Sequence, residues 1–234
     1  MIAFRVLGGV SLAGEEGPLS GKPVQPRRIA LLALLASAPH HTIARERLMA
    51  FLWPESSEDQ ARHRLSESLY VLRKSLGEEA LISEGDQVRL DTARLGCDLV
   101  AFRNAAQDGD LETAVDLYAG PFLDGFFLKE AEAFHRWVES ERQSLAQDFA
   151  QALESLAMAS DQSGDPLEAV KWWHRLVTHD PYNSRFALGL MRALARAGDH
   201  GNAIQHANEH EVCLREELGA EPPPEILALS LIHI

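Results

Sequence analysis

Residues 59–77 of this 234-residue chain read DQARHRLSESLYVLRKSLG, and they decide how its first part folds. Apolar side chains recur in this stretch at helical spacing, at Ala61, Leu65, Leu69, Leu72 and Leu76. We expect Ser56 or Ser57 to cap the helix and Gly77 to end it. A rotation of about 100° per residue turns the polar side chains away from the apolar stripe. These outward residues are His63, Glu67, Tyr70 and Lys74, flanked by Arg62, Arg64 and Arg73.

The outer face of this predicted helix has two interpretations. An α-helix fits the major groove of B-DNA, where Arg, His, Ser and Tyr side chains can contact base edges and phosphates. The alternative is a plain amphipathic surface helix, because Arg and Lys also occur on most solvated helix faces. The rest of the sequence bears on the choice between them.

Charge is distributed unevenly along the chain. Residues 1–96 hold 12 Lys/Arg and 12 Asp/Glu, whereas residues 97–234 hold 10 and 23, so the second part carries the whole net charge of −13. A DNA-contacting first part and a protein-contacting second part would show this asymmetry. The 46% hydrophobic content supports buried cores, and we expect neither a membrane span nor a signal peptide. Cys97 and Cys213 fit free thiols in a reducing cytoplasm.

Residues 1–95 are predicted to form a winged helix-turn-helix. The first expected element is a small antiparallel sheet of strands at 2–7 and 10–12 with a return through Leu19 and Val24. Helices are expected at 26–37, at 43–52 and over the stretch quoted above, followed by a terminal hairpin of 81–83 and 88–90. Pro26 is expected in the first turn of its helix, where proline is tolerated, and Thr42 is expected to cap the second helix. In such a fold the third helix enters the DNA groove and the hairpin lies over the adjacent backbone.

Several motifs in this part point to one family. They are Leu7-Gly8-Gly9, Pro26-Arg27-Arg28, Arg47-Leu48, Leu52-Trp53-Pro54, Gln60-Ala61-Arg62 and Leu72-Arg73-Lys74-Ser75-Leu76-Gly77. Together they resemble the streptomyces antibiotic regulatory protein type of bacterial activator, whose DNA-binding part is an OmpR-like winged helix. The resemblance implies a transcription factor that binds direct repeats near a promoter and touches RNA polymerase. His63 and Glu67 depart from the Asn or Gln expected more often on the reading face.

Position and chemistry divide the candidate DNA-contacting residues into two groups. Contacts at or near the bases are expected from His63, Arg64, Glu67 and Tyr70, since Arg commonly reads guanine and Glu can accept from cytosine. Phosphate contacts are expected from Arg27, Arg28, Arg62, Arg73, Lys74 and Arg89. Glu67 has an alternative role as the partner of His63, one helical turn away. The turn Glu55-Ser56-Ser57 is where the resemblance implies contact with RNA polymerase.

A repeated motif organises the second part, predicted to occupy residues 96–230. Gly-Asp followed by an alanine five residues after the glycine occurs three times, at 109–115, 164–170 and 198–204. The Gly-Asp pair is expected to form a turn, and the alanine to face a closely crossing helix. The last two copies are 34 residues apart, which is the tetratricopeptide period. The sequence therefore predicts an all-α domain of tetratricopeptide-like repeats with a concave partner surface.

The second part also resembles a known domain. Tyr118-Ala119-Gly120-Pro121-Phe122-Leu123, Asp180-Pro181 and Glu217-Leu218-Gly219-Ala220-Glu221-Pro222 are similar to the bacterial transcriptional activator domain that follows the winged helix in this family. We expect this domain to mediate self-association, as a homodimer or a tandem assembly on DNA, or contact with a partner. Residues 230–234 do not extend the pattern, and they are either a short tail or the end of a piece cut from a longer protein.

Three functional classes remain open: a DNA-binding activator, a tetratricopeptide-like adaptor, and a ligand or metal sensor on the same scaffold. His206, His210 and Cys213 have helical spacing that could supply three zinc ligands. His210 also fits the packing stripe of its repeat, and no CxxC or HExxH motif accompanies it, so we predict no metal. No GxSxG, Walker or dinucleotide motif is present, so we expect neither enzyme activity nor a cofactor. The expected partners are double-stranded DNA and RNA polymerase in the cytoplasm, and no membrane.

Overall fold

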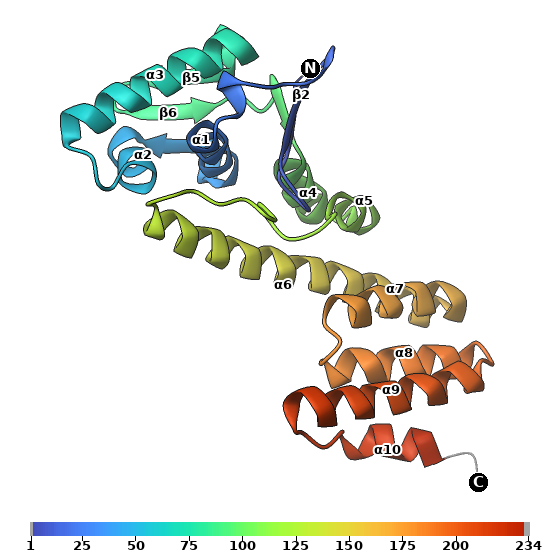
Figure 1. Ribbon diagram of the computed structural model, residues 1–234. Helices are drawn as coiled ribbons and strands as arrows, with labels where there is room; N and C mark the ends of the chain where they lie inside the picture. Colours follow the sequence, from blue (N-terminus) through green and yellow to red (C-terminus); the bar gives the residue numbers. More distant parts are fainter. Residues whose placement is uncertain (1, 232–234) are drawn as a thin grey trace. The chain divides into compact units, whose positions relative to one another are not determined.

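The computed structural model describes the backbone of residues 2–231 and the side chains of residues 2–228 (Figure 1). The chain divides into two compact units, one ending at Ala146 and the other beginning at Gln147. In the part that the structure describes, no helix combines the length and the apolar character that a membrane span requires. Residues 232–234 of the predicted tail lie outside the described residues.

A four-stranded sheet opens the first unit. Its strands lie in the order β3 (Gly17–Pro18), β2 (Ser11–Gly14), β1 (Ile2–Arg5) and β7 (Leu95–Cys97). β1 pairs antiparallel with β2 and parallel with β7, so the sheet is mixed rather than purely antiparallel as predicted. The predicted return through Val24 is wrong, because Lys22–Val24 forms a 3₁₀ turn in which Pro23 has no N–H to donate to a strand. The Asp98 carboxylate, just after β7, accepts the amides of Val6 and Leu7 and fixes the end of β1.

Three helices follow the sheet: α1 (Pro26–Ser37), α2 (Arg45–Leu52) and α3 (Glu58–Leu76). α1 has the predicted bounds, and its interior from Ile29 to Ala36 is buried on every side. A helix without a solvated face occupies the centre of a domain, and the other elements pack around it. Leu48 and Leu52 of α2 are fully buried and complete this core.

The wing is a three-stranded sheet in the order β4 (Thr42–Ala44), β6 (Gln87–Leu90) and β5 (Leu81–Glu84). The predicted hairpin is therefore confirmed, but the predicted helix start at Thr42 is wrong. Thr42 and Ile43 pair with Arg89 and Val88, and α2 begins only at Arg45. Thr42 and Ile43 are β-branched, and such residues favour a pleated strand over a helix. In β4 their backbone groups pair with strand β6.

The segment after α5 (Leu111–Leu117) returns to the N-terminal sheet. Leu7 forms an isolated antiparallel bridge with Phe122, and the Gly8 amide donates to the Pro121 carbonyl at 3.1 Å. A Cβ on Gly8 would lie 2.7 Å from the backbone of Ala119, so only glycine permits this approach. Arg142 donates to the Phe122 carbonyl at 2.7 Å and also holds this segment.

Helices make up the rest of the chain. They are α4 (Asp98–Asp108), α5 (Leu111–Leu117), α6 (Glu132–Ser163), α7 (Pro166–His179), α8 (Ser184–Arg196), α9 (His200–Leu218) and α10 (Pro224–Leu231). The compact units divide within α6, whereas the predicted domain boundary lies after residue 95. That boundary stays a prediction. Beyond it, the bridge from Phe122 to Leu7 joins the segment after α5 to the residues that follow β1.

The predicted repeat turns are confirmed. Gly109, Gly164 and Gly198 have φ angles of 80°, 78° and 82°. The aspartate after each glycine caps the next helix and accepts the amide three residues on, at 3.1–3.2 Å. Helices α7 and α8 pack closely, because a Cβ on Gly189 of α8 would lie only 2.5 Å from the Trp173 ring of α7. Ala114 and Ala169 are fully buried, while Ala203 is half-buried.

Candidate nucleic-acid interface

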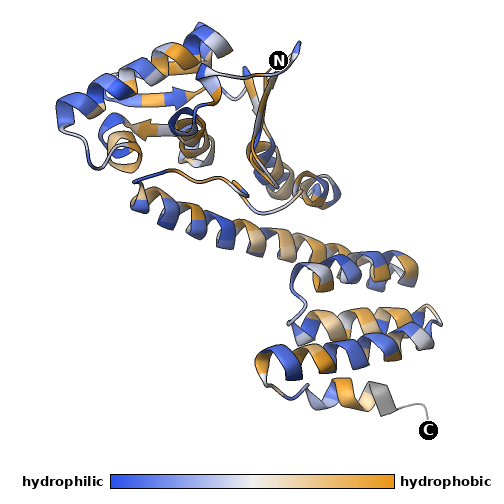
Figure 2. Cartoon of the chain, viewed as in Figure 1, coloured by the Kyte–Doolittle hydropathy of each residue, from blue (hydrophilic) through white to orange (hydrophobic). Residues whose placement is uncertain are grey.

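α3 has one buried face and one exposed face. Leu65, Leu69 and Leu72 are at most 1% exposed and fix the helix on the core. The predicted outward residues His63, Tyr70 and Lys74 are all exposed, and within the described residues they form no hydrogen bond or ion pair. Hydrophilic colouring dominates α3, whereas α1 is mostly hydrophobic (Figure 2). His63, Tyr70 and Lys74 therefore take no part in holding the helix in place, and these three side chains are available to a ligand.

The N-terminal turn of α3 differs in detail from the prediction. Ser57 occupies the N-cap position, but its side chain makes no capping hydrogen bond. The Ser56 hydroxyl instead accepts from Arg64 at 3.0 Å, which directs this guanidinium along the start of the helix. Arg62 pairs with Glu58 and Asp59 on the exposed surface. Gly77 ends the helix as predicted, with a φ of 103°.

Arg73 connects α3 to the wing. Its Nε donates to the Leu81 carbonyl and its Nη2 to the Ser83 hydroxyl, both at 2.7 Å. Arg45, at the start of α2, donates to the same hydroxyl at 3.0 Å. Sequence reasoning missed Arg45 because it placed this residue inside a longer helix. Across the hairpin, Arg89 lies 3.5 Å from Glu84 and keeps 40% of its side chain exposed.

Two arginines at the start of α1 are engaged within the fold. Arg27 is half-buried and donates to the Leu52 carbonyl at 2.8 Å. Arg28 is only 5% exposed and binds Glu67 of α3 at 3.1 Å. The alternative pairing of Glu67 with His63 is wrong, because Arg28 takes the carboxylate. A phosphate contact by Arg28 would require its side chain to leave this buried position.

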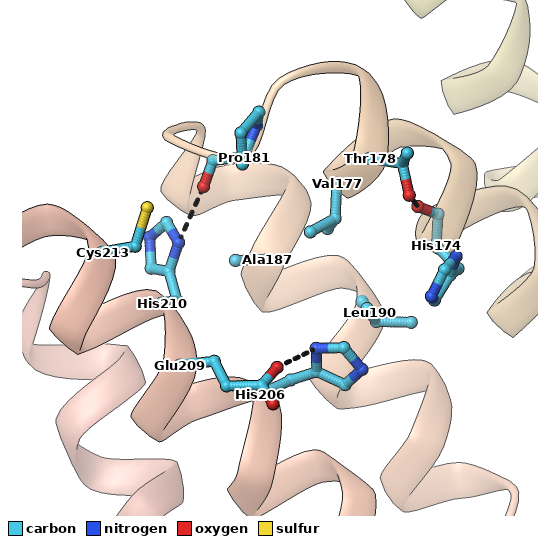
Figure 3. Close-up of a pocket in the computed structure, with 10 residues that line it drawn as sticks. All are labelled: His174, Val177, Thr178, Pro181, Ala187, Leu190, His206, Glu209, His210 and Cys213. Carbon is cyan, nitrogen blue, oxygen red and sulfur yellow. Dashed lines mark hydrogen bonds and ion pairs between the residues drawn. The ribbon is translucent and has the colours of Figure 1, made fainter. Parts of the chain in front are cut away.

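The histidine cluster predicted on α9 lines a cavity of about 280 Å³ between α7, α8 and α9 (Figure 3). His210 is 5% exposed, and burial lowers its pKa. Its Nδ1 faces the Pro181 carbonyl at 3.1 Å and its Nε2 the Ser184 hydroxyl at 2.9 Å, so a neutral ring uses both nitrogens within the fold. His206 lies 3.4 Å from Glu209.

No group of three His, Cys, Asp or Glu side chains among the described residues is arranged to hold a metal ion. Both cysteines are free thiols. Burial raises the pKa of the Cys97 thiol to about 12, so this side chain stays protonated and unreactive near neutral pH.

Comparisons with known proteins agree with this architecture. The family model for the bacterial transcriptional activator domain matches residues 90–231. The regulatory protein AfsR of Streptomyces griseus is 29% identical over 98% of this chain, which spans about a quarter (24%) of that relative. The transcriptional regulatory protein MoaR1 of Mycobacterium tuberculosis is 27% identical over 97% of this chain and 78% of its own length.

A solved structure shows a similar fold. Mycobacterium tuberculosis EmbR, in complex with a low-affinity phosphopeptide, superposes with a TM-score of 0.67 at 24% identity, covering 98% of this chain and 64% of that one. At this identity the likeness speaks for the fold alone. The predicted fold class, a winged helix followed by tetratricopeptide-like helices, is confirmed by this likeness and by the elements described above.

Proposed function

Because the chain belongs to the bacterial transcriptional activator domain family, we propose that it is a sequence-specific regulator, an activator, that binds double-stranded promoter DNA in the cytoplasm. The predicted resemblance to activators of the streptomyces antibiotic regulatory protein type is confirmed by the family match and by the AfsR and MoaR1 relatives. In the proposal, the winged helix reads DNA and the acidic helical repeats contact protein.

The exposed face of α3 carries this proposal. It presents His63, Tyr70 and Lys74 without partners in the described chain, opposite a fully buried leucine stripe. Arg73 bonds the same helix to the wing, so the hairpin is attached beside the helix. A winged helix uses this combination to place a helix in the major groove and a hairpin on the neighbouring backbone.

Base contacts are proposed for four exposed side chains of α3. Arg64 can bind guanine through two N–H groups, and Tyr70, 63% exposed, offers a hydroxyl and a ring to base edges. His63 and Glu67 are exposed on the same face. The docking angle of α3 decides which of these four reach a base and which reach the sugar-phosphate backbone.

Phosphate contacts are proposed for the cations at the edges of this surface. Lys74 and Arg62 lie at opposite ends of α3, Arg89 lies on the wing, and Arg27 lies at the start of α1. Arg73 is bonded to the wing and is proposed to orient it, with any phosphate contact secondary. These contacts would fix the register on the duplex and add no sequence information.

Protein contacts complete the proposal. The turn Glu55-Ser56-Ser57 lies directly before α3 and is largely exposed, so it can touch RNA polymerase bound beside the operator. Residues 97–234 carry the chain's entire net charge of −13, which would be repelled by DNA and suits protein partners. Binding to direct repeats as a dimer or tandem assembly follows from the resemblance.

Selection from a random duplex library with the full chain tests the proposal. The enriched duplex is then compared with a shuffled one by fluorescence anisotropy over a range of salt concentrations. We expect a direct repeat, preferred over the shuffled sequence, and log K falling linearly with log salt. A variant that replaces His63, Tyr70 and Lys74 with alanine should keep its fold and lose binding.

The matched control replaces three exposed residues of α9, Gln205, Val212 and Glu216, with alanine, and it should bind like the wild type. An adaptor without DNA binding would enrich no sequence and show no salt-dependent binding to either duplex. That result would overturn the proposed function.

A further inference from the structure

Arg28 is a buried cation in the first turn of α1. Its Nη1 donates to the Lys22 carbonyl at 2.8 Å and to the Gln25 side-chain oxygen at 2.7 Å. Its Nη2 donates to Oε1 of Glu67 at 3.1 Å, while Nε has no partner in the described part of the chain. A buried guanidinium is tolerated when it is paired and hydrogen-bonded. Glu67 is therefore the anion that balances this charge.

The partners in this ion pair have different surroundings. The Arg28 side chain is 6% exposed and the Glu67 side chain 58% exposed. Glu67 lies on the outer face of α3, one turn from His63 and close to one turn from Tyr70. Its Oε1 is bonded inward to Arg28, and no described residue bonds Oε2. The carboxylate is thus held at one oxygen and open at the other.

A free carboxylate on a DNA-facing surface would be repelled by phosphates. The buried Arg28 guanidinium partly cancels that repulsion, because its Nη2 lies 3.1 Å from Oε1 of Glu67. The same bond restricts the rotamers of Glu67 before any ligand arrives, so less conformational entropy is lost on binding. A buried arginine and an exposed glutamate then act as one preorganised acceptor.

We infer that Arg28 is a positioning residue that directs the open oxygen of Glu67 at a base bearing an exocyclic amino group. This inference rests on the proposed function. A carboxylate only accepts hydrogen bonds, and in the major groove the amino donors are N4 of cytosine and N6 of adenine. Guanine and thymine present only acceptors there, and adenine presents an acceptor at N7 beside its amino group. Glu67 therefore selects cytosine or adenine, and rejects guanine and thymine, at one position of the site.

The pairing with Arg28 determines what Glu67→Gln will do. Arg28 can only donate, so it takes the amide oxygen of the new side chain and turns the NH₂ group outward. The outward group changes from acceptor to donor, so guanine and thymine become preferred over cytosine, while adenine can still accept at N7. A glutamine free of Arg28 would instead read adenine with both groups.

Base-resolved selection from a random library, using all 234 residues of the chain, tests this prediction. The wild type should favour cytosine or adenine about tenfold at one position, as expected for one good base contact. Glu67→Gln should favour guanine or thymine over cytosine there by a similar factor and leave every other position unchanged. The double variant Arg28→Met/Glu67→Gln should lose this inversion and favour adenine.

The matched control is a second half-buried ion pair of the first unit, Arg103 with Glu141 at 2.7 Å. Arg103→Met/Glu141→Gln should lower the thermal midpoint and leave the base preference unchanged at every position. Glu67→Gln retains Arg28 and its hydrogen bonds, so it decides the question even where the double variants unfold.

Three results would overturn the inference. One is a Glu67→Gln preference identical to the wild type, and another is a change spread over all positions. The third is an Arg28→Met variant that binds every sequence more weakly with a salt slope reduced by about 1, which would make Arg28 a phosphate contact. If the wild type enriches no sequence at all, the proposed function itself fails.

Discussion

α3 and α9 are both 19-residue helices with histidines, arginines and glutamates around an apolar stripe, yet their polar side chains have opposite surroundings. On α3, His63 is exposed and has no partner among the described residues. On α9, His210 is buried and bonded through both ring nitrogens. The charges differ as well, since Glu209, Glu216 and Glu217 are exposed along α9.

This difference shows that residue type alone does not make a DNA-reading helix. Histidine at a helical spacing is structural where its ring nitrogens find partners inside the fold, and available where they do not. α3 is further distinguished by Arg73, which attaches it to the wing. The proposed interface thus rests on exposure, missing partners and the neighbouring hairpin together.

The largest expected effect is on stability, and matched histidine substitutions in α9 and α3 measure it. His210→Ala removes a buried ring and leaves its partners unbonded, so we expect a loss of about 2–4 kcal/mol in the free energy of unfolding. His63→Ala should change that free energy by less than about 0.5 kcal/mol. Urea unfolding followed by circular dichroism measures both. A costly His63→Ala would mean that α3 depends on its outer face for stability.

Matched arginine substitutions separate specific from general binding. Arg64→Ala should weaken binding to the selected duplex by about 1–3 kcal/mol and binding to random DNA much less. Arg215→Ala on α9, which pairs with Glu211 and Glu221, should leave both affinities unchanged. Anisotropy titrations on the two duplexes supply the numbers. Equal losses on both duplexes for Arg64→Ala would remove its proposed base contact.

A lysine substitution should have a smaller and uniform effect. Lys74→Ala should weaken binding to all sequences alike and reduce the slope of log K against log salt by about 0.9, the value for one phosphate contact. Lys171→Ala on α7, where the ammonium pairs with Glu168, is the control and should not alter the slope. An unchanged slope for Lys74→Ala would place this side chain away from the backbone.

The pH dependence of stability should show the smallest difference. Burial lowers the pKa of His210 in the folded chain, so on acidification the unfolded chain takes up this proton first. The free energy of unfolding should therefore fall as the pH drops through about 6.5, the usual histidine pKa, and level off below the folded pKa. His210→Gln should lose this part of the slope in urea titrations at several pH values. A slope identical to the wild type would show that another group titrates.

Local signals were sufficient for the elements whose bounds the sequence predicted. Pro26 and the Ala38-Pro39 break define α1, and the Gly-Asp turns define the repeats. The missed elements depend on distant partners: β4 forms because Val88 and Arg89 lie beside Thr42 and Ile43, and β7 because β1 lies beside it. No local pattern reports such a pairing.

In the candidate site, too, local spacing predicted some features and distant contacts determined the others. Helical spacing alone placed His63, Tyr70 and Lys74 on the exposed face of α3. It did not show that Arg28 is buried, because that depends on Glu67, 39 residues further along the chain. The spacing offered His63 as the partner of Glu67, and only the packing of α1 against α3 reveals Arg28 instead.

Methylation interference at guanine N7 tests the central claim most directly, because this atom lies in the major groove, where α3 is proposed to dock. The selected duplex is lightly methylated, bound by the full chain, and separated into bound and free fractions. The account predicts that methylated guanines within each repeat are depleted from the bound fraction, and that this depletion weakens at one guanine for Arg64→Ala. Equal methylation of the bound and free fractions at every guanine would contradict it.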